Sequence, residues 1–140
     1  MKSSLIWTAA LMLAASSPLA AQTSISGGTA GSAAVGGTSA STVGTGGTST
    51  SPTGTGSSIA GGGSAAAVDG KAQSRSHVNQ GKGPVLNSNT RAQAHDGGTF
   101  SRSQTRTKVK AGEEVRSTTK TMSHEPGSAP VKSRTSISQQ

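Results

Sequence analysis

Residues 99–110, Thr-Phe-Ser-Arg-Ser-Gln-Thr-Arg-Thr-Lys-Val-Lys, alternate strictly between two kinds of side chain. Small or β-branched side chains occupy the odd positions, and long, mostly basic side chains occupy the even positions. Successive side chains of an extended chain point to opposite sides. A period of two therefore predicts a β-strand with one Ser/Thr/Val face and one basic face.

The same pattern continues toward the C-terminus in two further runs. Residues 115–124 and 131–137 again place Ser, Thr, Val or Ile on one side. Arg116, Lys120 and Met122 of the first run, and Lys132 and Arg134 of the second, lie on the other side. Residues 111–114 and 125–130 contain Gly or Pro and separate the runs as turns. Three alternating runs joined by two turns predict a small antiparallel β-meander near the C-terminus. Because neither face is apolar, such a meander alone would be marginally stable in water.

The preceding segment, residues 22–68, has a very different composition. It contains no charged side chain, and 40 of its 47 positions are Gly, Ser, Thr or Ala. Gly-rich chains favour a flexible coil, and a Ser/Thr-rich composition is also typical of O-glycosylated stalks. Gly-Gly-Thr recurs at 27–29, 36–38 and 46–48. We interpret this recurrence as compositional coincidence, because the segment has too few apolar residues for a stacked solenoid.

Large apolar side chains are scarce throughout residues 22–140. Leu, Ile, Val and Phe together occupy 13 of these positions. That share lies far below the level of roughly 20% at which globular folding is expected, and the whole chain carries a net charge of +8. We therefore expect a mostly intrinsically disordered protein. Its parts would be an uncharged low-complexity tract (22–68), a polar linker (69–98) and a basic β-prone segment (99–137).

The first 21 residues resemble a cleaved export signal. A basic residue, Lys2, precedes an apolar run at residues 5–15, and Pro18 and small residues follow. The run is shorter than the roughly 20 residues that a helix needs to span a bilayer. We expect cleavage after Ala21 and release into the bacterial periplasm or the medium. The chain contains no Cys, so it forms no disulfide and no Cys-based metal site.

The cations of the β-prone segment form the main candidate site. In an extended chain, residues two apart lie about 6.6 Å from each other on one side, a spacing that suits contact with a polyanion. Such binding would weaken with salt, because it releases counterions. The alternative is that the basic residues serve only solubility. The candidate polyanion-contact residues are Arg102, Arg106, Lys108, Lys110, Arg116, Lys120, Lys132 and Arg134.

The expected partners follow from export and from the scarcity of aromatic residues. Phe100 is the only aromatic residue after residue 21, and sequence-tolerant binding of single-stranded nucleic acid usually needs several aromatic platforms. Nucleic acid is therefore disfavoured. Anionic polysaccharide, glycolipid or a membrane surface is expected instead. The alternative function is a structural spacer or matrix component that self-associates by β-strand addition.

The sequence contains no pattern that indicates an enzyme. His77, His95 and His124 are 18 and 29 residues apart, which matches no known metal-ligand spacing. The sequence has no Gly-x-Ser-x-Gly motif and no phosphate-binding loop. We expect a non-enzymatic protein with no catalytic residue, no metal and no cofactor.

Overall fold

A computed structural model describes residues 23–52 and 54–140, and within these ranges all regular structure is β-strand. None of the described residues forms a helix that is long and apolar enough to cross a membrane. The predicted export signal, residues 1–21, lies outside the described residues. The strands are β1 (Thr23–Val35), β2 (Thr38–Ser51), β3 (Gly54–Ala67), β4 (Lys71–Gln80), β5 (Val85–Asp96), β6 (Thr99–Lys110), β7 (Glu114–His124) and β8 (Val131–Gln139).

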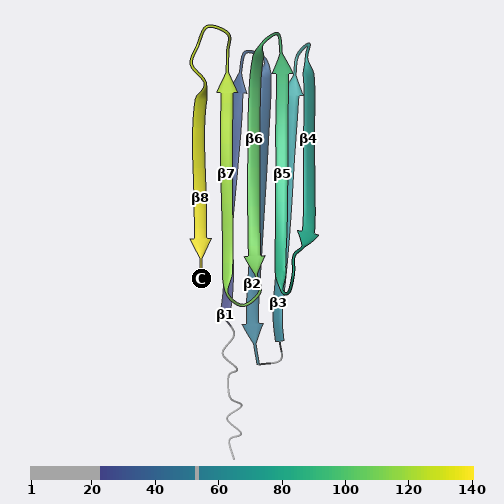
Figure 1. Cartoon of the computed structure of the whole chain (residues 1–140), viewed down its shortest axis with the longest axis vertical. Coiled ribbons are helices and arrows are strands. Elements are labelled where there is room, and N and C mark those ends of the chain that lie inside the picture. The colour runs from purple at the N-terminus through teal and green to yellow at the C-terminus, as the bar shows by residue number, and fades with distance from the viewer. Residues whose placement is uncertain (1–22, 53) are drawn as a thin grey trace, which may run out of the picture.

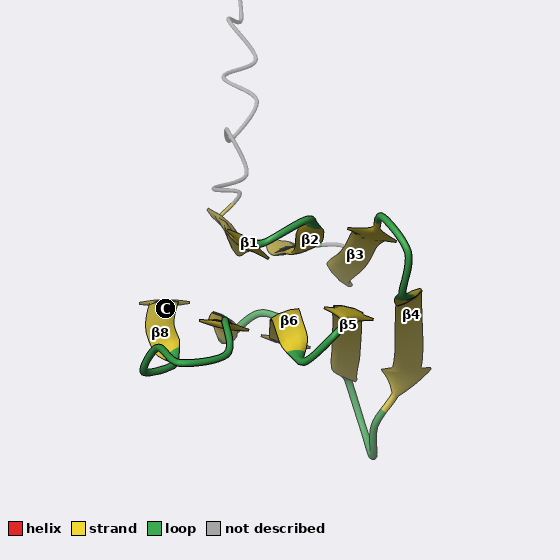
Figure 2. Cartoon of the chain, turned by 90° about the horizontal axis from the view of Figure 1, so that it is seen from above, coloured by secondary structure: helices red, strands yellow, loops and turns green. Residues whose placement is uncertain are grey.

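The strands form two antiparallel sheets that pack face to face. The first contains β1, β2 and β3, and the second contains β4 to β8, each in chain order. Figure 1 shows the five-stranded sheet in front of the three-stranded sheet, with the strands of both running nearly vertically. Figure 2 shows the two layers from above. β4 is an edge strand of the five-stranded sheet and lies next to both β5 and β3. The fold is a β-sandwich of consecutive antiparallel strands.

The expectation of a mostly disordered chain is wrong for the described residues. The uncharged tract forms the whole three-stranded sheet, and the segment interpreted as a linker contains β4 and β5. The meander predicted over 99–137 covers only three strands of the fold. Its three runs are β6, β7 and β8, but they belong to a larger sheet that the uncharged tract covers.

Two Gly-Gly pairs close the hairpins at one end of the sandwich. Gly36 and Gly37 join β1 to β2 with φ of 48° and 79°, and Gly97 and Gly98 join β5 to β6 with φ of 55° and 93°. Positive φ at both central residues is the geometry of two-residue hairpin loops, which Gly adopts without steric cost. In each hairpin the next residue is a buried Thr, Thr38 or Thr99.

Hydroxyl groups take much of the place of apolar side chains between the sheets. Seven of them form one continuous network in the order Thr107, Ser117, Thr29, Thr119, Thr105, Thr42, Ser103. Thr29 of β1 and Thr119 of β7 are joined at 2.8 Å, and Thr42 of β2 and Thr105 of β6 at 2.7 Å. Thr105 and Thr119 are 2.6 Å apart. Because each buried hydroxyl has a partner, its removal from water is compensated.

Glycines on the inner face of the three-stranded sheet allow the two sheets to approach closely. A Cβ on Gly44 would lie 2.6 Å from Thr105 Cγ2 and even closer to Thr107 Oγ1. A Cβ on Gly31 would overlap Thr119 in the same way. The absent side chains thus leave the space that the β6 and β7 threonines fill. This close approach brings the hydroxyl groups of the two sheets within hydrogen-bond distance.

Candidate polyanion-binding face

The outer face of the five-stranded sheet carries nearly all the basic residues of the described chain. Strand register and burial place eleven Lys and Arg side chains on this surface, opposite the buried Ser, Thr, Ala and Val positions. We call it the basic face. Its cations are Lys71, Arg75, Arg91, Arg102, Arg106, Lys108, Lys110, Arg116, Lys120, Lys132 and Arg134. The other described cation, Lys82, lies in the turn between β4 and β5.

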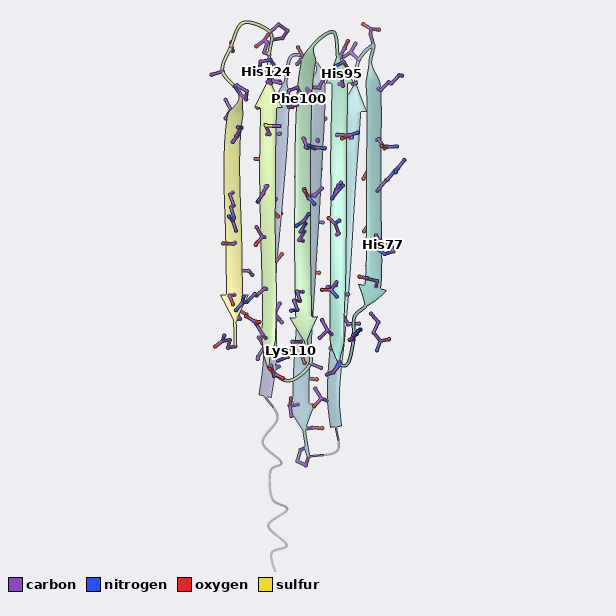
Figure 3. The ribbon with its side chains drawn as sticks, in the orientation of Figure 1. His77, His95, Phe100, Lys110 and His124 are labelled. Carbon is purple, nitrogen blue, oxygen red and sulfur yellow. The ribbon has the colours of Figure 1, made fainter. Side chains whose placement is uncertain are left out.

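All eight cations predicted from the sequence lie on the basic face, but they fall into two groups. One group, Arg102, Lys120, Lys132 and Arg134, surrounds a hollow of about 380 Å³ between β6, β7 and β8. We call these four residues the hollow cluster. The other group, Arg106, Lys108, Lys110 and Arg116, lies toward the opposite end of the strands. Figure 3 shows Lys110 at that end.

Acidic groups neutralise only the far end of the basic face. Lys110 pairs with Glu113, and Arg116 pairs with Glu114; these are the ion pairs found among the described residues. Partial burial opposes ionisation of the Glu114 carboxyl. Hydrogen bonds from Arg116 and Ser138, with the nearby basic charges, outweigh it and lower the pKa of Glu114. The hollow cluster has no such acidic partner within the described part of the chain.

Several cations lie directly opposite another cation on the neighbouring strand. The pairs are Arg75 with Arg91, Lys120 with Arg134, and Lys108 with Arg116. Like charges in directly opposed positions destabilise a sheet. The arrangement therefore favours any anion that comes to lie between them, because the anion relieves this repulsion.

Some repulsion within the face is relieved by neutral amides. Gln104 lies between Arg91 and Arg106. With its amide oxygen toward the two guanidinium groups, it accepts from Arg91 Nε at 3.1 Å and Arg106 Nε at 3.0 Å. The expected repulsion among the β6 cations is also reduced by register. Arg102 and Arg106 face Gln93 and Asn89 on β5, so neutral residues separate them from the next charges.

Three cations of the basic face were missed because their segment was interpreted as a linker. Lys71 and Arg75 belong to β4, and Arg91 belongs to β5. The signal that could have found them is the alternation in residues 86–94, where Leu, Ser, Thr and Ala alternate with Asn, Arg and Gln. The Gly-Gly pair after Asp96 is a further sign of a hairpin into β6.

A second hollow, of about 700 Å³, lies on the same face between β4, β5 and β6. Its lining includes Lys71, His95, Phe100, Arg102 and Met122. We call it the aromatic hollow. Figure 3 shows His95, Phe100 and His124 close together at the end of the face where the β5–β6 hairpin turns. The aromatic hollow adjoins the hollow cluster, because Arg102 and Met122 line both.

The rings of Phe100 and His124 pack against each other, with centroids 5.4 Å apart and planes tilted by 42°. The Nδ1 atom of His124 is buried and has no hydrogen-bond partner among the described residues. The described residues contain no cluster of three His, Cys, Asp or Glu side chains that could hold a metal ion. This end of the face thus combines the phenyl ring of Phe100 with the basic side chains of Lys71 and Arg102.

Comparison of the chain with protein-family models, with curated proteins and with solved structures finds no match.

Proposed function

We propose that this chain is an exported, non-enzymatic protein that binds anionic polymers of the bacterial cell envelope through its basic face. The observation that carries the proposal is the density of unneutralised cations on one surface. Eleven Lys and Arg share the face, and within the described part of the chain two of them pair with acidic residues. Folding alone gives no reason to place like charges opposite one another.

The geometry of the sheet supports contact with an extended polymer. Neighbouring strands lie about 4.8 Å apart, and same-face residues along a strand are separated by about 6.6 Å. The basic face thus presents a grid of cations across β4 to β8. A polymer with repeated negative charges gains several contacts at once, whereas a single small anion gains few. Contacts of this kind raise affinity by releasing counterions.

The first test removes the hollow cluster. In the full chain, Arg102, Lys120, Lys132 and Arg134 are changed together to Gln, and affinity for polygalacturonate is measured between 50 and 200 mM salt. We expect affinity at the lowest salt to fall at least tenfold. The slope of log affinity against log salt should flatten by roughly three units, given about 0.7–0.9 for each of the four lost contacts on nucleic acids.

The control for this test is Lys82→Gln, which removes a cation outside the basic face. It should change affinity and salt slope little. Equal affinity of the fourfold variant and the unchanged chain at low salt would refute binding through the basic face.

A second candidate function, a matrix component that assembles by strand addition, has support at one sheet edge. β1 is an edge strand of 13 residues with no charged side chain and no Pro. The unpaired backbone N–H and C=O groups of such an edge can bond a further strand, because neither a charged side chain nor a Pro hinders its approach. Strand addition predicts self-association that persists in 1 M salt, measurable by analytical ultracentrifugation. A monomer at high salt and high protein concentration would exclude it.

A further inference from the structure

We infer that the aromatic hollow is a subsite for an acidic sugar unit, such as a hexuronate residue of a polysaccharide. This inference rests on the proposed function and specifies the class of polymer that the basic face binds. It depends on one juxtaposition: Phe100, the only Phe, Tyr or Trp among the described residues, lines a solvent-facing hollow together with Lys71 and Arg102.

The position of Phe100 is not explained by packing between the sheets. Its neighbours along β6, Thr99 and Ser101, are buried on the inner face, whereas Phe100 is half-buried on the outer face. It contributes nothing to the hydroxyl network. One side of its ring is held by His124. The ring therefore forms a fixed apolar wall on an otherwise polar and basic surface.

The residues around Phe100 supply the other contacts that an acidic sugar needs. Phe100 aligns with His95 and Lys71 across the strands, and the adjacent row contains Arg102, Gln93 and Gln73. A carboxylate on the sugar ring would be held by Lys71 or Arg102, and the two Gln amides would bond its hydroxyl groups.

An acidic sugar suits this combination better than a plain polyanion does. A sugar ring has an apolar C–H face that packs on an aromatic ring, with hydroxyl and carboxylate groups at its edge. The volume of about 700 Å³ lies within the range of ligand-binding pockets. A polypeptide or polyphosphate chain has the charges but no such apolar ring face, so it gains nothing from Phe100.

The test compares two carboxylate polymers, polygalacturonate and poly-L-glutamate, at equal carboxylate concentration and low salt. The unchanged full-length chain should bind polygalacturonate about tenfold more tightly. Phe100→Leu removes the ring and keeps an apolar side chain. It should weaken binding of polygalacturonate five- to tenfold and leave binding of poly-L-glutamate unchanged. Phe100→Trp retains a ring and should restore the preference.

The possible results separate this inference from the proposed function. If both polymers bind equally and Phe100→Leu alters neither affinity, the sugar subsite is overturned while binding through the basic face stands. If neither polymer binds, both are overturned. If Phe100→Leu weakens binding of both polymers equally, the ring stabilises the basic face as a whole and does not contact a sugar unit. The subsite is then again overturned. Circular dichroism of each variant checks that the fold is kept.

Discussion

Replacing Gly44 by Val is expected to destabilise the protein by more than about 3 kcal/mol, which would unfold a domain of ordinary stability in part or in full. The Cβ of any larger residue at this position would overlap Thr107 Oγ1 and approach Thr105 Cγ2 to 2.6 Å. The sheets would have to separate to admit it, which would break the hydrogen bond between Thr42 and Thr105. Urea unfolding followed by circular dichroism measures the loss.

The same strand provides a matched control. Gly47 lies on the outer face of β2, where a Cβ would make ordinary contacts of 3.6 Å or longer. Val is well suited to a half-buried strand position such as Gly47, so Gly47→Val should leave the unfolding midpoint unchanged or raise it. Equal destabilisation by the two substitutions would contradict the close approach of the sheets at Gly44.

Replacing Thr119 by Val is expected to destabilise the protein by about 1–3 kcal/mol, although the two side chains have nearly the same shape. Thr119 Oγ1 bonds both Thr29, at 2.8 Å, and Thr105, at 2.6 Å, and it is the link between the β1 and β2 halves of the hydroxyl network. Without it, two buried hydroxyl groups each lose a partner. The free energy of unfolding in urea measures the effect.

The adjacent residue on the opposite face is the control for this change. Thr118 is half-buried on the basic face and belongs to no interior hydrogen bond among the described residues. Thr118→Val should be neutral or slightly stabilising. A double-mutant cycle of Thr105→Val with Thr119→Val should show that the two changes are not additive. Additive effects would mean that the network does not act as a unit.

The basic segment was easier to predict than the uncharged tract because its two faces differ in residue type. Along β6, Ser and Thr alternate with Arg and Lys, so the period of two is visible in the sequence. In β2 both faces consist mostly of small residues, with Thr42 and Gly44 inside and Val43 and Thr45 outside. The same period is present in the structure, but composition conceals it. The Gly-Gly pairs before Thr38 and Thr99 were the local signal of hairpins.

The expectation of disorder failed because it counted only apolar burial. Val109 and Val115 are fully buried, but Ser101, Ser103, Thr105 and Thr119 are buried to a similar degree. Paired hydroxyl groups and glycines allow a thin interior between the sheets. The number of Leu, Ile, Val and Phe residues does not predict such an interior. Such pairing depends on the register of two separate sheets, which the spacing of residues along one strand does not reveal.

The candidate site was predicted in part. The alternation placed the cations of β6, β7 and β8 on one side, and the structure brings Arg102, Lys120, Lys132 and Arg134 around one hollow. The aromatic hollow was missed, because it needs β4 and β5 beside β6.

Amide hydrogen exchange of the full chain, read residue by residue by NMR, tests the sandwich most directly. Exchange should be slowest in β2 and β6, the central strands whose inner faces meet, and faster in the exposed edge strands β4 and β8. Amide hydrogens of both the uncharged tract and the basic segment must therefore be protected from exchange. Protection confined to residues 99–137, with residues 23–67 exchanging at the rate of an unfolded chain, would contradict the two-sheet fold.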